Sequence, residues 1–132
     1  MKNAILYSAV AVFIIASISQ SCKKDEDKPK IEIYGSWLVL QTDSNGLQYH
    51  VELRFNENNS YDWMLLEDVP GHSDSHAEFT LDENILTIVS DPDCDGTGTY
   101  HITVDSDKLA LIAQSDDCTP RAAALEYIWY KK

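Results

Sequence analysis

Three aspartates at alternate positions are the clearest candidates for chemistry in this sequence. Asp91, Asp93 and Asp95, followed by Gly96, match the first half of a calcium-binding loop, where carboxylates ligate the ion and glycine makes the sharp turn. The twelfth position holds Ile102 in place of the bidentate Glu that such a loop needs. The pattern therefore predicts weak Ca²⁺ binding, with a solvated acidic loop as the alternative, and no other cofactor is expected.

Two cysteines form a second candidate site. Cys94 and Cys118 lie in segments rich in Asp, Gly and Pro that are typical of loops. Redox or metal chemistry would favour a Cys-x-x-Cys motif or a neighbouring histidine, and the sequence has neither here. In an exported chain, such an even pair predicts a structural disulfide.

The first 21 residues indicate export. Lys2 precedes an apolar run that ends at Ser19, and the chain becomes strongly polar directly after Cys22. The run is too short for a comfortable transmembrane helix, which needs ~20 apolar residues, so residues 1–21 are predicted to be a signal peptide. The small residues before Cys22 resemble those of a bacterial lipoprotein signal, which implies acylation of Cys22, for example with palmitate. An ordinary secretory signal is the alternative.

Residues 22–33 are predicted to form a tether between the lipid and the folded domain. The segment is dominated by charges and contains Pro29, so it has little to pack. Its acidic triplet, Asp25-Glu26-Asp27, is similar to the tag by which some Gram-negative bacteria send lipoproteins to the cell surface. The expected location is therefore the cell envelope, as a surface-exposed outer membrane lipoprotein; the alternative reading of the triplet is a solvated spacer.

The overall charge excludes one class of partner. The chain has 132 residues, with 22 acidic against 10 basic side chains and a formal net charge of -12. Nucleic acid binding needs clustered Lys and Arg, so no nucleic acid partner is expected. The length suits one domain, and 44% hydrophobic residues are enough for a packed core.

From residue 34 to residue 132 the apolar pattern has a period of two, which is typical of half-buried strands. Asn45-Gly46 marks a tight hairpin turn, and polar turns recur about every eight to twelve residues. Eight strands are predicted: 34–42, 48–56, 60–67, 76–82, 85–90, 98–105, 108–114 and 124–131. The short connections favour an all-β, eight-stranded antiparallel up-and-down barrel.

Gly35-Ser36-Trp37 at the start of the first strand resembles the Gly-x-Trp signature of the lipocalin superfamily. The resemblance covers about residues 34–132, and short bacterial lipocalin-like lipoproteins are the most similar group. It implies that Trp37 plugs the closed end of the barrel beside Gly35, and that Arg121 packs across the Trp37 ring. A typical lipocalin carries a helix before its last strand, and here only Ala122–Ala124 could form a turn of one.

The function expected from these features is binding without catalysis. No nucleophile elbow, catalytic triad or phosphate loop can be assembled from the sequence. A small apolar ligand in the barrel mouth is the first hypothesis, and a structural or protein-interaction module that meets another envelope protein is the alternative. Aromatic side chains on the inward register are the candidate ligand contacts, although the same side chains could simply fill the core: Tyr49, Phe55, Trp63, Phe79, Tyr100, Tyr127 and Trp129.

Overall fold

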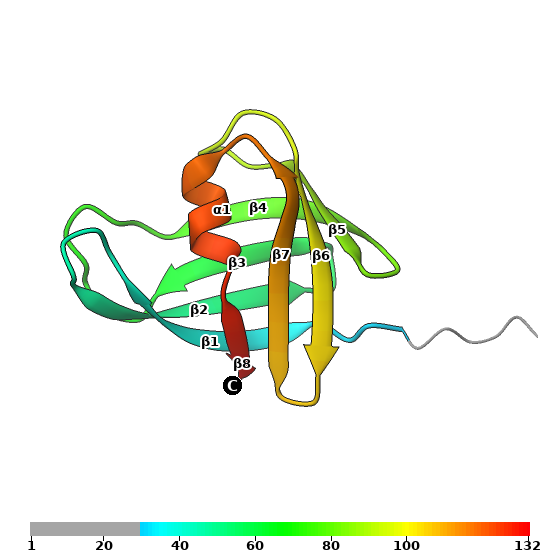
Figure 1. The fold of residues 1–132 in the computed structure, drawn as a ribbon, viewed down its shortest axis with the longest axis horizontal. Coiled ribbons are helices and arrows are strands. Elements are labelled where there is room, and N and C mark those ends of the chain that lie inside the picture. Colours follow the sequence, from blue (N-terminus) through cyan, green and yellow to red (C-terminus); the bar gives the residue numbers. More distant parts are fainter. Residues whose placement is uncertain (1–29) are drawn as a thin grey trace, which may run out of the picture.

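The computed structural model describes residues 30–132 and confirms an eight-stranded antiparallel barrel that closes on itself. Each strand pairs with the next one along the chain, and the last strand pairs with the first (Figure 1). The elements are β1 (Gly35–Thr42), β2 (Gln48–Asn56), β3 (Ser60–Leu65), β4 (Ser75–Asp82), β5 (Ile85–Ser90), β6 (Gly98–Asp105), β7 (Lys108–Asp116), α1 (Thr119–Leu125) and β8 (Ile128–Lys131).

The two ends of the barrel differ because long and short connections alternate along an up-and-down chain. Tight turns join β2 to β3, β4 to β5 and β6 to β7, and positive φ angles at Asn59, Glu83 and Ser106 mark these turns. We call this the turn end. The opposite end, which we call the helix end, carries the longer connections: 43–47, 66–74, 91–97 and the segment containing α1.

Side chains of alternate residues fill the barrel interior. The fully buried core includes Trp37, Phe79, Tyr100 and Trp129, and Phe55 meets Phe79 edge to face with ring centroids 5.4 Å apart. Packing of this kind leaves little room for a ligand along the barrel axis. The interior is therefore the structural core of the protein.

The largest difference from the predicted elements lies before the last strand. The expected strand 124–131 is shorter, Ile128–Lys131, and the helix α1 precedes it. Pro120 in the first turn and three alanines favour a helix there. Leu125, Tyr127 and Trp129 alternate with other residues as in a strand, but Leu125 is the last residue of α1 and only Trp129 lies in β8. Figure 1 shows α1 beside β7, where the Glu126 carboxylate accepts the Ala113 N–H at 2.8 Å and so satisfies part of the β7 edge.

The folded domain begins a few residues before the predicted boundary at 34. Ile33, expected to belong to the tether, is fully buried, and its carbonyl accepts the indole N–H of Trp37 at 2.7 Å. Ile31 also packs against the core. The end of the predicted tether therefore contributes to the packing of the barrel.

Trp37 is buried as the Gly-x-Trp motif implies, but the cation over its ring is not Arg121. Lys131 Nζ lies 4.6 Å from the Trp37 ring centroid and donates to the Tyr34 carbonyl at 3.1 Å. Gly35 has a φ of 107°, and a Cβ there would lie 3.4 Å from Lys131 Nζ, so glycine suits this position. Arg121 belongs to the helix end, and the implied Arg121–Trp37 packing is therefore wrong.

A buried carboxylate on the barrel wall makes stability depend on pH. Glu52 accepts hydrogen bonds from Lys132, Ser36 and Arg54 at 2.6–2.7 Å. The Lys132 contact is the strongest influence, and together these donors outweigh burial and lower the pKa of Glu52 from 4.5 to about 2.

Because the folded state favours the charged form, Glu52 should stabilise the fold above about pH 4.5 and lose this contribution as the pH falls toward 2. Glu52→Gln should lower the free energy of unfolding at pH 7 by roughly 2 kcal/mol, a figure reduced for the solvent exposure of Lys132 and Arg54. Urea denaturation between pH 2.5 and 7 measures this effect. A deficit that stays constant over that range would contradict the assignment.

Candidate functional site

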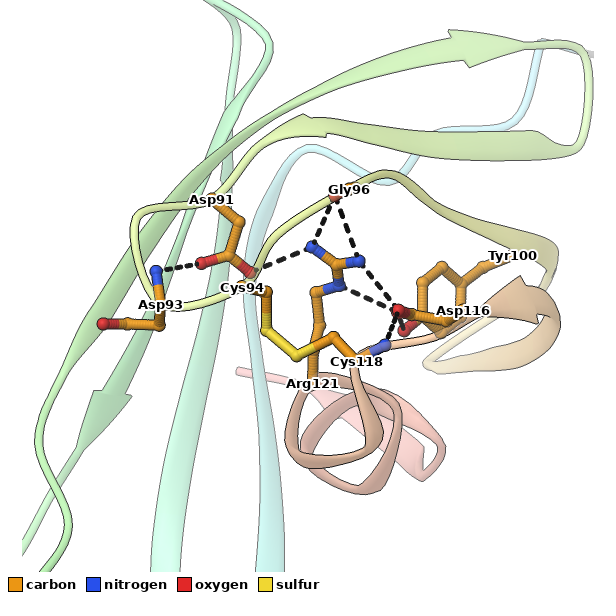
Figure 2. A network of polar contacts seen from close by, with 8 residues as sticks. All are labelled: Asp91, Asp93, Cys94, Gly96, Tyr100, Asp116, Cys118 and Arg121. Atoms are coloured by element: carbon orange, nitrogen blue, oxygen red, sulfur yellow. Dashed lines mark hydrogen bonds and ion pairs between the residues drawn. A yellow bond between two sulfur atoms is a disulfide. The ribbon is translucent and has the colours of Figure 1, made fainter.

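Arg121 is the centre of a buried network at the helix end of the barrel. Its Nε and Nη2 donate to the two carboxylate oxygens of Asp116 at 2.8 and 2.7 Å. Its Nη1 donates to Asp91 at 3.3 Å, and both terminal nitrogens reach the Gly96 carbonyl at 3.4–3.5 Å. Figure 2 shows that one side chain thereby ties α1 to the end of β7 and to the 91–97 loop. Every N–H of the guanidinium is used.

The charged groups of this network stabilise one another in their ionised forms. Burial tends to raise the pKa of Asp116, but hydrogen bonds from Arg121 and Tyr100 outweigh it and keep the pKa below its usual value. The Asp116 contact also raises the pKa of Arg121. The Tyr100 hydroxyl donates to the same carboxylate. Burial and the contact with Asp116 raise the pKa of Tyr100. The network is thus a fixed ion pair at neutral pH.

The predicted disulfide is present and joins the same two segments. Cys94 of the 91–97 loop is bonded to Cys118, which directly precedes α1, across a sequence separation of 24 residues. The Cys118 N–H donates to Asp116 at 2.8 Å. The covalent bond and the Arg121 network therefore reinforce one another (Figure 2).

Two residues of this network had no role in the sequence-based expectations. They are Asp116, which binds the guanidinium, and Gly98, which lies beside the ion pair. A Cβ at Gly98 would overlap the Asp116 carboxylate and would lie 3.1 Å from Arg121 Nε, so glycine makes room for the ion pair. An Asp two residues before a cysteine in a loop is a signal for a local turn, but the sequence does not reveal its arginine partner.

A pocket of about 160 Å³ opens between β3, the 91–97 loop and α1, and we call it the helix pocket. The disulfide and the Arg121 network hold two of its walls together. More of its lining is apolar than polar. The side chains that line it are Tyr61, Trp63, Ser73, Ser75, Asp91, Asp93, Cys94, Pro120, Arg121, Ala124 and Leu125.

Trp63, which lines this pocket, carries an indole N–H without a hydrogen-bond partner. Trp37 Nε1 donates to the Ile33 carbonyl, and Trp129 Nε1 donates to the Leu125 carbonyl. Trp63 Nε1, by contrast, is the one buried side-chain nitrogen or oxygen without a hydrogen-bond partner in residues 30–132. An unpaired buried N–H costs about 1–3 kcal/mol, so an acceptor supplied from outside the chain would be stabilising.

The predicted ligand contacts lie in four different places. Phe79, Tyr100 and Trp129 belong to the filled core, and Phe55, also buried, borders a shallow hollow near the turn end. Trp63 lines the helix pocket. Tyr49 and the half-buried Tyr127 border a wider hollow of about 500 Å³ on another side of α1, together with His72 and Asp43. The structure therefore does not bring the seven residues together around one internal cavity.

The three aspartates of the calcium motif do not converge either. One oxygen of Asp91 accepts the Asp93 backbone N–H at 2.9 Å, and the other accepts Arg121 Nη1. Asp93 and Asp95 are exposed. No group of three or more His, Cys, Asp or Glu side chains placed to hold a metal occurs within residues 30–132. The first half of the motif thus makes a loop that is braced by arginine.

The predicted signal peptide and Cys22 lie outside the described residues, as do residues 22–29 of the predicted tether. Among residues 30–132, no helix has the length and apolar character needed to cross a membrane. Comparison with known proteins gives no match to a family model, to a curated protein or to a solved structure.

Proposed function

We propose that this protein is a binding protein without catalytic activity, and that the helix pocket holds its ligand. The observation that carries the proposal is Trp63: it lines a largely apolar pocket and keeps an unpartnered indole N–H. Ligand pockets typically combine apolar walls with a few polar groups that fix orientation. The ligand is accordingly a small apolar molecule that carries a hydrogen-bond acceptor.

The size of the pocket limits the ligand. A cavity of about 150 Å³ holds a molecule the size of benzene, and the helix pocket measures about 160 Å³. A single ring or a compact branched group fits, either as a free molecule or as the end of a larger one. Fatty acids and other long ligands do not fit in this pocket or in the filled barrel interior.

Calorimetric titration with benzyl alcohol and toluene tests the proposal. Both should bind. Trp63→Phe should weaken the binding of benzyl alcohol by about three- to tenfold, because one hydrogen bond of about 0.5–1.5 kcal/mol is lost. The same variant should change toluene binding much less. Tyr130→Phe, on the outer face of the barrel, is the control and should change neither. Failure of both ligands to bind would contradict the proposal.

The proposal for location rests on the sequence. The apolar run before Cys22 and the acidic triplet after it support a lipocalin-like lipoprotein that is anchored in the outer membrane by acylated Cys22. Such an anchor needs no spanning helix, since each buried lipid methylene contributes ~0.8 kcal/mol. Metabolic labelling with a palmitate analogue tests it, and a Cys22→Ser variant that retains the label would contradict it.

A second candidate function is an interaction module, favoured by apolar side chains on the outer face of the barrel. Leu40, Ile112, Ile128 and Tyr130 are each about half exposed, and the register places Leu38 opposite Tyr130 and Ala110 opposite Ile128 on neighbouring strands. Ile128→Ser should abolish any association with an envelope protein through this face. It should leave binding in the helix pocket unchanged, which separates the two candidates.

A further inference from the structure

The charges around the helix pocket are unbalanced. Arg121 is the one cationic side chain in its lining, and Asp116 already binds that guanidinium through both oxygens. Asp91 shares this one cation with Asp116, so Asp93, which also lines the pocket, adds negative charge for which the lining supplies no second cation. Asp91 meets Arg121 only through a longer contact of 3.3 Å.

The aromatic wall lies within this negative field. Tyr61 and Trp63 are two residues apart on β3, so they project from the same face of the strand, and both are more than nine-tenths buried. Burial is the main reason that the pKa of Tyr61 is raised, and the Asp91 carboxylate raises it further against the opposing effect of Arg121. The negative charge of Asp91 therefore reaches the aromatic wall of the pocket.

Aromatic rings beside carboxylates form a favourable environment for an organic cation. The electron-rich face of Trp or Tyr attracts an ammonium group while its apolar substituents pack against the same ring. Carboxylates at the rim add Coulomb attraction at short range. A metal ion would instead need several converging ligands, and residues 30–132 hold no such cluster.

We propose that the ligand of the helix pocket is a small organic cation, an ammonium or quaternary ammonium compound that also carries an oxygen acceptor for Trp63 Nε1. This inference rests on the proposed function and refines its ligand class: the apolar substituents of the cation pack as a neutral apolar ligand would, and its charge adds attraction to the carboxylates. A compact cation with a hydroxyl group matches the pocket in size, charge and hydrogen bonding. Anions are disfavoured, because every N–H of Arg121 is already used and the remaining charges repel them.

Three probes of nearly the same shape isolate the charge: choline, its neutral isostere 3,3-dimethylbutan-1-ol, and the anion 3,3-dimethylbutanoate. Titration of the full chain should give the tightest binding for choline, weaker binding for the alcohol and the weakest for the anion. Raising the salt concentration should reduce the advantage of choline over the alcohol. Equal or tighter binding of the alcohol would overturn the inference while leaving the proposed function intact.

A matched pair of variants identifies the charge responsible. Asp93→Asn should weaken the binding of choline by about fivefold, because it removes one nearby charge that is partly screened by water. It should leave the affinity for 3,3-dimethylbutan-1-ol unchanged. Asp95→Asn removes the same charge from an exposed neighbour outside the pocket lining, so it should leave both unchanged. Equal effects of the two variants on choline would overturn the inference. If neither these probes nor benzyl alcohol bind, the proposed function itself fails.

Discussion

Replacing Arg121 by methionine should lower the free energy of unfolding by about 3–5 kcal/mol, among the largest effects expected for a single substitution in this protein. Methionine retains much of the apolar volume of the arginine stem and removes the guanidinium. The variant would leave the side chains of Asp116 and Asp91 buried without their shared cation. Removing one member of a buried ion pair is costly because the remaining charge cannot be solvated. Urea denaturation at pH 7 measures the loss.

Arg54→Met is the matched control for this experiment. Arg54 also binds a buried carboxylate, Glu52, at 2.7 Å, but its side chain is 46% exposed, so the loss should be below about 1 kcal/mol. Adding Asp116→Asn to Arg121→Met should recover part of the lost stability, because the stranded charge is then removed. Equal small losses for Arg121→Met and Arg54→Met would contradict the role given to Arg121.

The double substitution Cys94→Ser/Cys118→Ser should destabilise the fold by about 3 kcal/mol. The disulfide closes a loop across 24 residues, and a cross-link of this span restricts the unfolded chain by about that amount in the chain-entropy account. The Arg121 network would still join the 91–97 loop to α1 in this variant, but without a covalent bond. Binding of benzyl alcohol should weaken in the same variant.

Reduction of the disulfide provides an internal control for this prediction. Dithiothreitol should lower the unfolding midpoint of the native protein to nearly that of the double variant, and it should not change the midpoint of the variant itself. An unfolding free energy that is the same, within 0.5 kcal/mol, with and without the disulfide would contradict the prediction.

The sequence was a good guide to the barrel because the strands depend on local pattern. Alternation of apolar and polar residues, with turns such as Asn45-Gly46, predicted the strand count and the closed up-and-down order, which the structure confirms. The helix α1 was missed because the residues after it also alternate in hydrophobicity. Its alanines and Pro120 are the local signals that favour it.

The candidate site was less predictable because it depends on contacts between distant segments. The disulfide followed from counting cysteines, but the partners of Arg121 lie as far away as Asp91 and Gly96. The resemblance to lipocalins implied that Arg121 packs on Trp37. The topology instead puts Arg121 at the helix end, and Lys131 is the cation that lies over the Trp37 ring. The missing partner of the Trp63 N–H is likewise a property of three-dimensional packing.

The central claim is that ligand binds beside Trp63, and the indole N–H signals in a ¹⁵N correlation spectrum test it most directly. The three tryptophans give three such signals, and Trp37 and Trp129 already donate to backbone carbonyls. Titration with benzyl alcohol or choline should shift the Trp63 signal downfield and saturably, because its N–H gains an acceptor, while the other two stay nearly fixed. A Trp63 signal that does not move with either ligand would contradict the account.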